Sequence, residues 1–140
     1  MEIVGNKLTI NIPSGMEIDI ENSDFVNGII KFKPTYNNII ETLGINSFTE
    51  ILIHKDYEDR LQAVAQLQNI AKYYNGNWRP NWENYIESKY EIEYSSINGY
   101  YIAESKVVNN GAICFKNKKD AIAVINNSNF RDILDEVFNN

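Results

Sequence analysis

Residues 56–76 constrain the fold most, because they carry a long apolar pattern with the period of a helix. Leu61, Val64, Gln68 and Ala71 follow one seam, and Leu67, Ile70 and Tyr74 widen it. This spacing places the apolar side chains on one side of an α-helix. Asp56 is expected to cap the helix start, and Gly76 to end it. A helix of this length with one apolar face needs other elements to cover that face.

The flanking segments alternate apolar and polar residues with the period of a β-strand. At the N-terminal end, residues 7–13 and 29–33 are predicted strands, residues 16–21 are a short strand or an extended loop, and Asn27-Gly28 marks a hairpin turn. Further along, residues 90–94, 100–108 and 112–115 are joined by Asn-Gly turns. These three segments predict an antiparallel meander. Residues 48–53 are a further predicted strand.

Three more helices are predicted at residues 36–43, 118–125 and 130–138. Thr35 and Asn117 have the residue types and positions of N-caps, and Gly44 fits a helix end. The expected fold is therefore α+β: an antiparallel sheet, made of an N-terminal hairpin and a C-terminal three-stranded meander, with three or four helices on one face. A chain of 140 residues fits a single domain, residues 1–140.

The net charge of −6 argues against a general nucleic-acid or membrane-surface binder, because such proteins usually carry a basic face. The N-terminal residues lack the long apolar stretch of a signal peptide, and no run approaches membrane-spanning length. We therefore expect the chain in the cytoplasm where it is made.

Signatures of catalysis and metal binding are not recognisable in the sequence. There is one histidine, His54, and one cysteine, Cys114, so a zinc site built from these residue types is not expected. Cys114 lies in an apolar run and is predicted to be a small buried residue. The acidic residues Asp19, Glu21 and Asp24 alternate as on the exposed side of a strand. We expect no enzyme activity, no cofactor and no metal.

Lys116, Lys118 and Lys119 form a basic cluster at a predicted helix start. Cations at this end oppose the helix dipole, which suggests a nearby anion, whereas the simpler interpretation is a solvated helix start.

The most informative group is aromatic: Trp78, Arg79, Trp82 and Tyr85 lie close together after the long helix. Aromatic faces and a guanidinium can stack on a base or anchor a protein interface. In the alternative interpretation, the two indoles pack against the helix and lock the loop. We take these four residues and the lysine cluster as the candidate binding residues.

Residues 75–82 read Asn-Gly-Asn-Trp-Arg-Pro-Asn-Trp. With the Gly-x-Glu-Ile-Asp stretch at 15–19, the Ile-x-Phe-Lys stretch at 30–33, and Phe115-Lys116 before a helix, the chain resembles a group of small uncharacterised phage and prophage proteins, notably of Bacteroidetes. The resemblance implies a phage accessory protein that acts in the cytoplasm of a bacterial host, and it brings no catalytic residues.

The first functional hypothesis is a non-enzymatic phage accessory protein that binds a host or phage protein, in one version to counter host defence. The second is an oligomeric binder of a small nucleotide-like ligand, in which Trp78 and Trp82 stack on the base and Arg79 or the lysine cluster pairs with phosphate. A structural component of the virion is a third hypothesis, and a weak enzyme comes last.

Overall fold

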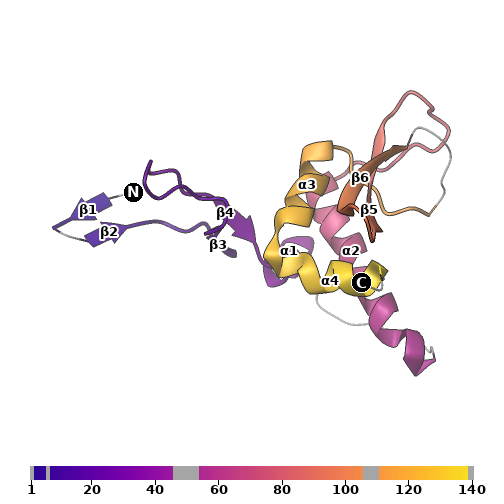
Figure 1. The fold of residues 1–140 in the computed structure, drawn as a ribbon, viewed down its shortest axis with the longest axis horizontal. Coiled ribbons are helices and arrows are strands. Elements are labelled where there is room, and N and C mark those ends of the chain that lie inside the picture. Colours follow the sequence, from indigo (N-terminus) through magenta and orange to yellow (C-terminus); the bar gives the residue numbers. More distant parts are fainter. Residues whose placement is uncertain (1, 6, 46–53, 106–110, 139–140) are drawn as a thin grey trace.

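The computed structural model describes residues 2–5, 7–45, 54–105 and 111–138 (Figure 1). Its elements are β1 (Glu2–Val4), β2 (Lys7–Thr9), β3 (Met16–Ile18), β4 (Phe32–Pro34), α1 (Tyr36–Leu43), α2 (Lys55–Asn75), β5 (Lys89–Ser95), β6 (Gly99–Ser105), α3 (Lys118–Asn126), a 3-10 turn (Ser128–Phe130) and α4 (Arg131–Phe138). The predicted α+β class is confirmed. The predicted strand at residues 48–53 lies outside the described residues.

The long helix α2 organises the core, as its sequence pattern predicts. Leu67, Ile70 and Ala71 are almost fully buried on one of its faces. Helices α1, α3 and α4, strand β5, the 3-10 turn and the segment before α3 supply the rest of the buried cluster, through residues such as Ile39, Ile92 and Phe115. Each fully buried aliphatic side chain stabilises the fold by about 1.5–3 kcal/mol. None of the described helices is long and apolar enough to cross a membrane.

Local capping explains where the helices begin and end. Thr35 accepts a hydrogen bond from the Asn38 N–H at 3.1 Å at the start of α1, and Gly44 adopts φ 68° at its end. Helix α2 begins two residues earlier than its predicted cap implies. Its cap is His54, whose Nδ1 accepts from the Asp56 N–H at 3.3 Å, so Asp56 lies in the first turn.

The predicted single sheet is wrong: the described strands form three separate antiparallel hairpins, β1–β2, β3–β4 and β5–β6. The third strand of the predicted meander is reduced to one bridge, in which Tyr90 and Phe115 exchange backbone hydrogen bonds of 3.1 and 2.8 Å. This bridge lies on β5, whereas a meander would place the third strand on β6. The Asn75 side chain binds the Cys114 carbonyl and the Lys116 N–H, which lie on the edge of this segment that faces away from β5.

The structure contains an N-terminal hairpin, as predicted, but the residues that pair in it differ from the predicted ones. Asn27-Gly28 does lie in a turn, closed by a bridge between Asp24 and Ile29. The paired strands, however, are β3 and β4, with Met16 opposite Pro34. Strand β1, which the sequence analysis did not identify, pairs with β2 to form a second hairpin.

We call residues 2–5 and 7–34 the N-terminal arm. Figure 1 shows its β1–β2 hairpin extending away from the helices, on the opposite side of the molecule from β5 and β6. The base of the arm is fixed to the α3–α4 corner by polar contacts. The Lys33 ammonium donates to the Ser128 hydroxyl at 2.8 Å, and the Asn127 amide donates to the Pro34 carbonyl at 3.1 Å.

Candidate functional site

A cavity of about 450 Å³ lies where the last turns of α2 meet the loop that follows it. It is lined by Gln68, Asn69, Lys72, Asn75, Trp78, Arg79, Pro80, Trp82, Ala112 and Cys114. Both indoles are partly buried and the guanidinium is exposed. The cavity therefore combines flat aromatic surfaces, side-chain amides and two cations. We call it the Trp cavity.

Glu87 holds the loop between α2 and β5 in shape. Its carboxylate accepts a hydrogen bond from the Asn81 N–H at 2.9 Å, pairs with the Lys89 ammonium at 3.5 Å and accepts from the Trp78 indole. The Asn81 N–H, followed by the charge of Lys89, keeps the pKa of the Glu87 carboxyl below its ordinary value. One carboxylate thus fixes the position of the first indole.

Lys89, the first residue of β5, supports the second indole. Its side chain is buried, and its ammonium donates to the carbonyls of Asn84 at 3.2 Å and Glu87 at 3.1 Å. It also lies 5.5 Å from the centre of the Trp82 ring, within the range of a cation–π contact. The Glu87–Lys89 pair therefore touches both indoles of the Trp cavity.

The α2 side of the cavity is equally fixed by hydrogen bonds. The Lys72 ammonium donates to the Gly76 carbonyl at the helix end, and the Asn69 amide donates to the Tyr36 hydroxyl at 3.1 Å. The Asn75 amide donates to the Cys114 carbonyl at 2.8 Å. The wall is therefore built from side chains that hydrogen bonds to other parts of the chain hold in position.

The charges of the lining favour an anion. Arg79 and Lys72 are cationic, and the described residues that line the cavity include no carboxylate. The Cys114 thiol does not change this at neutral pH, because burial, with a smaller effect of Glu91, raises its pKa to about 11. A protonated thiol is a poor nucleophile, so Cys114 contributes shape to the wall.

The structure brings together three of the seven predicted site residues, Trp78, Arg79 and Trp82. Tyr85 belongs to the same loop, but it is exposed and does not line the cavity. Lys116, Lys118 and Lys119 are also exposed and lie outside the lining. Only the backbone of Lys116 is linked to the cavity wall, through its N–H, which donates to the Asn75 side chain at 2.9 Å.

The sequence analysis missed the polar residues that α2 contributes, Gln68, Asn69, Lys72 and Asn75. A signal was present, because Gln68, Lys72 and Asn75 have the i, i+4, i+7 spacing of one helix face. That polar face ends where the Trp78 segment begins. A polar stripe leading into an aromatic loop would have pointed to a shared site.

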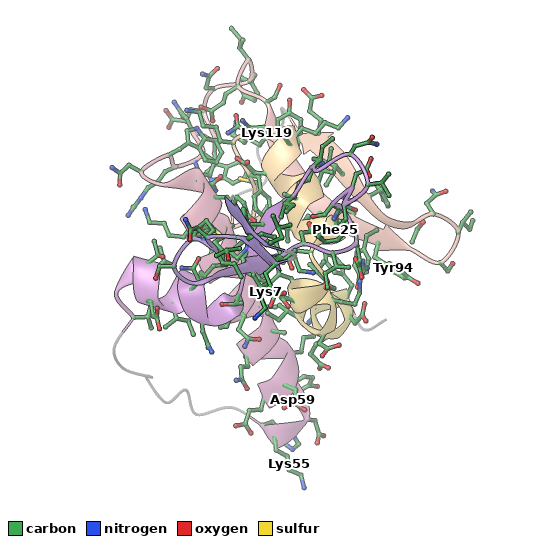
Figure 2. All side chains as sticks on the ribbon, turned by 90° about the vertical axis from the view of Figure 1, so that its left-hand side faces the viewer. Lys7, Phe25, Lys55, Asp59, Tyr94 and Lys119 are labelled. Atoms are coloured by element: carbon green, nitrogen blue, oxygen red, sulfur yellow. The ribbon has the colours of Figure 1, made fainter. Side chains whose placement is uncertain are left out.

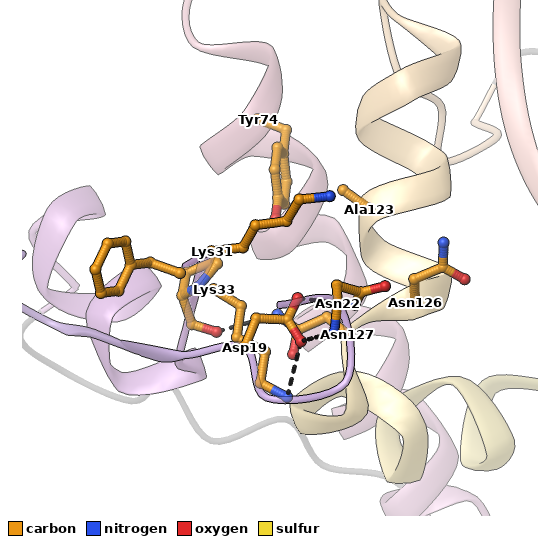
Figure 3. Close-up of a pocket in the computed structure, with 10 residues that line it drawn as sticks. Asp19, Asn22, Lys31, Lys33, Tyr74, Ala123, Asn126 and Asn127 are labelled. Atoms are coloured by element: carbon orange, nitrogen blue, oxygen red, sulfur yellow. Dashed lines mark hydrogen bonds and ion pairs between the residues drawn. The ribbon is translucent and has the colours of Figure 1, made fainter. Parts of the chain in front are cut away.

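A second cavity, of about 230 Å³, lies between the β3–β4 hairpin, α2 and α3 (Figure 3). Lys31 and Tyr74 border it, and burial raises the pKa of the Tyr74 hydroxyl to about 12. The charge of Lys33 is already matched by Asp19 at 4.0 Å and by Glu17 at 3.8 Å. Because internal partners already bind the Lys33 ammonium and the volume is about half that of the Trp cavity, this cavity is the weaker candidate.

The described residues contain no group of three or more His, Cys, Asp or Glu side chains that could hold a metal ion. Comparison with protein-family models, with curated proteins and with solved structures finds no match to the chain.

Proposed function

We propose that this chain is a non-enzymatic binding protein whose Trp cavity holds a planar, anionic small molecule of the nucleotide type. The observation that carries the proposal is the lining itself: Trp78, Trp82 and the Arg79 guanidinium border a single hollow of about 450 Å³. A volume of this size lies within the ordinary range for small-molecule sites.

Each class of lining group fits one part of such a ligand. An indole face stacks on a base, a contact that contributes about 1–3 kcal/mol in base-binding proteins. A guanidinium binds phosphate through two parallel hydrogen bonds, and an ammonium adds a point charge. The amides of Gln68 and Asn69 offer both donors and acceptors for the polar edge of a base.

The supports of the two indoles strengthen this proposal. Glu87 binds the Trp78 side chain, and the buried Lys89 ammonium lies against Trp82. Indoles that are held in place before binding lose little freedom when a ligand arrives, so more of the contact energy remains as affinity.

Native mass spectrometry of gently purified protein is the direct test of a retained ligand, and titration with adenosine 5′-monophosphate tests the chemistry. We expect saturable quenching of tryptophan fluorescence. Adenosine alone and inorganic phosphate alone should each bind more weakly than the monophosphate. Arg79→Ala should weaken binding of the monophosphate by about 10- to 100-fold, the range expected for a lost charge-assisted contact.

Lys119→Ala is the matched control, because it removes an exposed cation outside the cavity. Its affinity should equal that of the unmodified chain. A clean subunit mass together with no quenching by any nucleoside monophosphate would contradict the proposal. Equal losses in Arg79→Ala and Lys119→Ala would also contradict it, since they would indicate attraction by overall charge alone.

A second candidate, a phage accessory protein that binds a host or phage protein, is favoured by the same loop. Tyr85 and Ile86 are exposed beside the Trp cavity, and aromatic side chains are common anchors of protein interfaces. The resemblance to phage proteins supports a partner of that origin, including a host defence protein. If this candidate is correct, capture of a host protein should be lost in Tyr85→Ala and retained in Arg79→Ala.

A further inference from the structure

The smaller cavity, which we call the junction cavity, lies where the N-terminal arm meets α2 and α3 (Figure 3). The one carboxylate among its described lining residues, that of Asp19, is already bound within the chain. It accepts hydrogen bonds from the Asn22 amide at 2.8 Å and from the Asn22 N–H at 3.3 Å, and the Lys33 ammonium lies 4.0 Å away. The charges of Asp19 and Lys33 therefore balance each other.

Lys31 is the lining cation whose charge is left unmatched. Figure 3 shows its side chain extending from the arm toward α3, on which Ala123 lies. Among the described residues, the Lys31 ammonium has no ion pair, and only the backbone of this residue forms hydrogen bonds. The lining of the junction cavity thus retains one net positive charge.

Two neutral side chains border the same space from the helices. The Tyr74 hydroxyl, on α2, has no hydrogen-bond partner among the described residues, and Figure 3 shows it at the end of the ring that faces Lys31. Because burial raises the pKa of this hydroxyl to about 12, it keeps its proton at neutral pH. Asn126, at the end of α3, also has a side-chain amide without a partner in the described part of the chain. An ammonium, a hydroxyl and an amide are therefore available, and each can donate a hydrogen bond.

We propose that the junction cavity binds a small tetrahedral oxyanion, either free phosphate or the phosphate group of a small monoester. The anion receives the charge of Lys31 and hydrogen bonds from Tyr74 and Asn126. Three donors that come from the arm, α2 and α3 suit a tetrahedral anion better than a planar carboxylate, which has two oxygens. The volume of about 230 Å³, half that of the Trp cavity, restricts the ligand to a small one.

An anion in the junction cavity joins the arm to the helices, because its partners come from both parts. Binding should therefore slow amide hydrogen exchange in residues 16–34 of the arm, while the β5–β6 hairpin, which does not line the cavity, exchanges as before. Hydrogen exchange with and without inorganic phosphate, followed by mass spectrometry of the full chain, measures this difference. Equal exchange of residues 16–34 in the two samples would contradict the bridging contact.

Amide NMR spectra of the full chain, titrated with inorganic phosphate at constant ionic strength, locate the site and measure its affinity. The signals of residues around Lys31, Tyr74 and Asn126 should shift together and saturate, with a dissociation constant on the order of 1 mM. Sulfate should shift the same signals, and acetate should bind more weakly. Tighter binding of glycerol 3-phosphate than of phosphate would assign the site to a monoester, and the reverse order to free phosphate.

Two substitutions test the donors. Lys31→Met should weaken phosphate binding by at least about 10-fold, because it removes a charge-assisted contact. Tyr74→Phe keeps the ring and removes the hydroxyl, so a loss of about 3- to 10-fold is expected. Lys7→Met is the matched control and should bind phosphate normally. Lys7 is an exposed cation of the same arm, on the hairpin that projects toward the viewer in Figure 2, and it lies outside the cavity lining.

Several results would overturn the proposal. One is the absence of saturation at phosphate concentrations well above the expected dissociation constant, and another is a set of shifts confined to the Trp78 segment. Equal losses in Lys31→Met and Lys7→Met would indicate attraction by overall charge, and acetate that binds as tightly as phosphate would contradict a tetrahedral ligand. The same spectra show whether each variant is folded. The site is separate from the Trp cavity, so Lys31→Met should retain normal quenching of tryptophan fluorescence by adenosine 5′-monophosphate.

Discussion

The charged side chain of Lys89 is only 1% exposed to solvent. Lysine is rarely buried to this degree without partners. Its partners are the Asn84 and Glu87 carbonyls, the Glu87 carboxylate and the Trp82 ring. Three of these four contacts lie on the loop that borders the Trp cavity, and the fourth is an indole of its lining. A single buried ammonium therefore connects the stability of the loop to the shape of the site.

Lys89→Met tests this connection at the scale of one residue. Methionine keeps the length of the side chain and leaves the two carbonyls without their donor. We expect a loss of about 1–3 kcal/mol in the free energy of unfolding, measured by urea denaturation, and a red shift of tryptophan emission. Lys118→Met, at an exposed site on α3, is the control. Unchanged stability and emission would mean that water replaces the ammonium at no cost.

The pH dependence of the loop depends on Glu87. Because its folded-state pKa is held below the ordinary 4.5, chiefly by the Asn81 N–H, its contribution to stability is present above pH 4.5 and is lost as pH falls through the folded value. We expect tryptophan emission to change on acidification in that range. Glu87→Gln should remove this step while leaving the emission near neutral pH little altered. A step of the same size in the variant would assign the titration to another group.

At the scale of elements, one side chain joins the end of α2 to the segment before α3. Asn75 donates to the Cys114 carbonyl at 2.8 Å and accepts from the Lys116 N–H at 2.9 Å. An amide that bonds to an N–H and a carbonyl two residues apart acts as a short piece of β-ladder. It holds residues 114–116 against the helix and places Cys114 in the wall of the Trp cavity.

Asn75→Ala should therefore loosen two elements at once. Loss of two hydrogen bonds is expected to lower the free energy of unfolding by about 1–3 kcal/mol. The buried Cys114 thiol should also react faster with a thiol reagent, in proportion to the more frequent opening of the segment. Asn77→Ala, two residues further on and exposed, is the matched control. If thiol reactivity is equal in the two variants, the Asn75 contacts do not hold the segment closed.

The sequence predicted the elements whose causes are local. The Thr35 cap and the Gly44 end of α1 follow from residues within a few positions of each other, and the structure contains both. The predicted apolar stripe of α2 is correct only in part: Leu67, Ile70 and Ala71 are buried, whereas Leu61 and Gln68 are exposed. The third meander strand failed for a reason of tertiary structure. Phe115 bridges to Tyr90 on β5, and Asn75, far away in sequence, binds the edge of the segment that faces away from β5. Alternating residues cannot reveal either contact.

The candidate site, too, was predicted only where its residues are close together in the sequence. Trp78, Arg79 and Trp82 are neighbours in the chain, so their grouping was visible in the sequence. Whether Lys72 and Asn75 line the cavity depends on the rotation of α2 about its own axis. The packing of the apolar face of α2 sets that rotation. The lysine cluster around Lys118 was judged from helix-end electrostatics alone, and the structure places it outside the cavity.

At the scale of the whole molecule, the chain has two parts with different sources of stability. From Tyr36 onward, helices and the β5–β6 hairpin share a buried apolar cluster. The arm is attached to them by polar contacts at its base, including Asn129, whose amide donates to Glu17 at 2.9 Å, and Lys33, which donates to Ser128. The β1–β2 hairpin lies beyond this attachment, so the body should not depend on it.

A chain that lacks residues 1–13 tests this division. It keeps β3, β4 and the polar contacts at the base of the arm, and it loses β1 and β2. In dilute solution we expect its free energy of unfolding to lie within about 0.5 kcal/mol of the full chain, the size of a surface change. Urea denaturation of the two chains measures this difference. A large loss of stability in the shortened chain would show that the hairpin stabilises the body of the molecule.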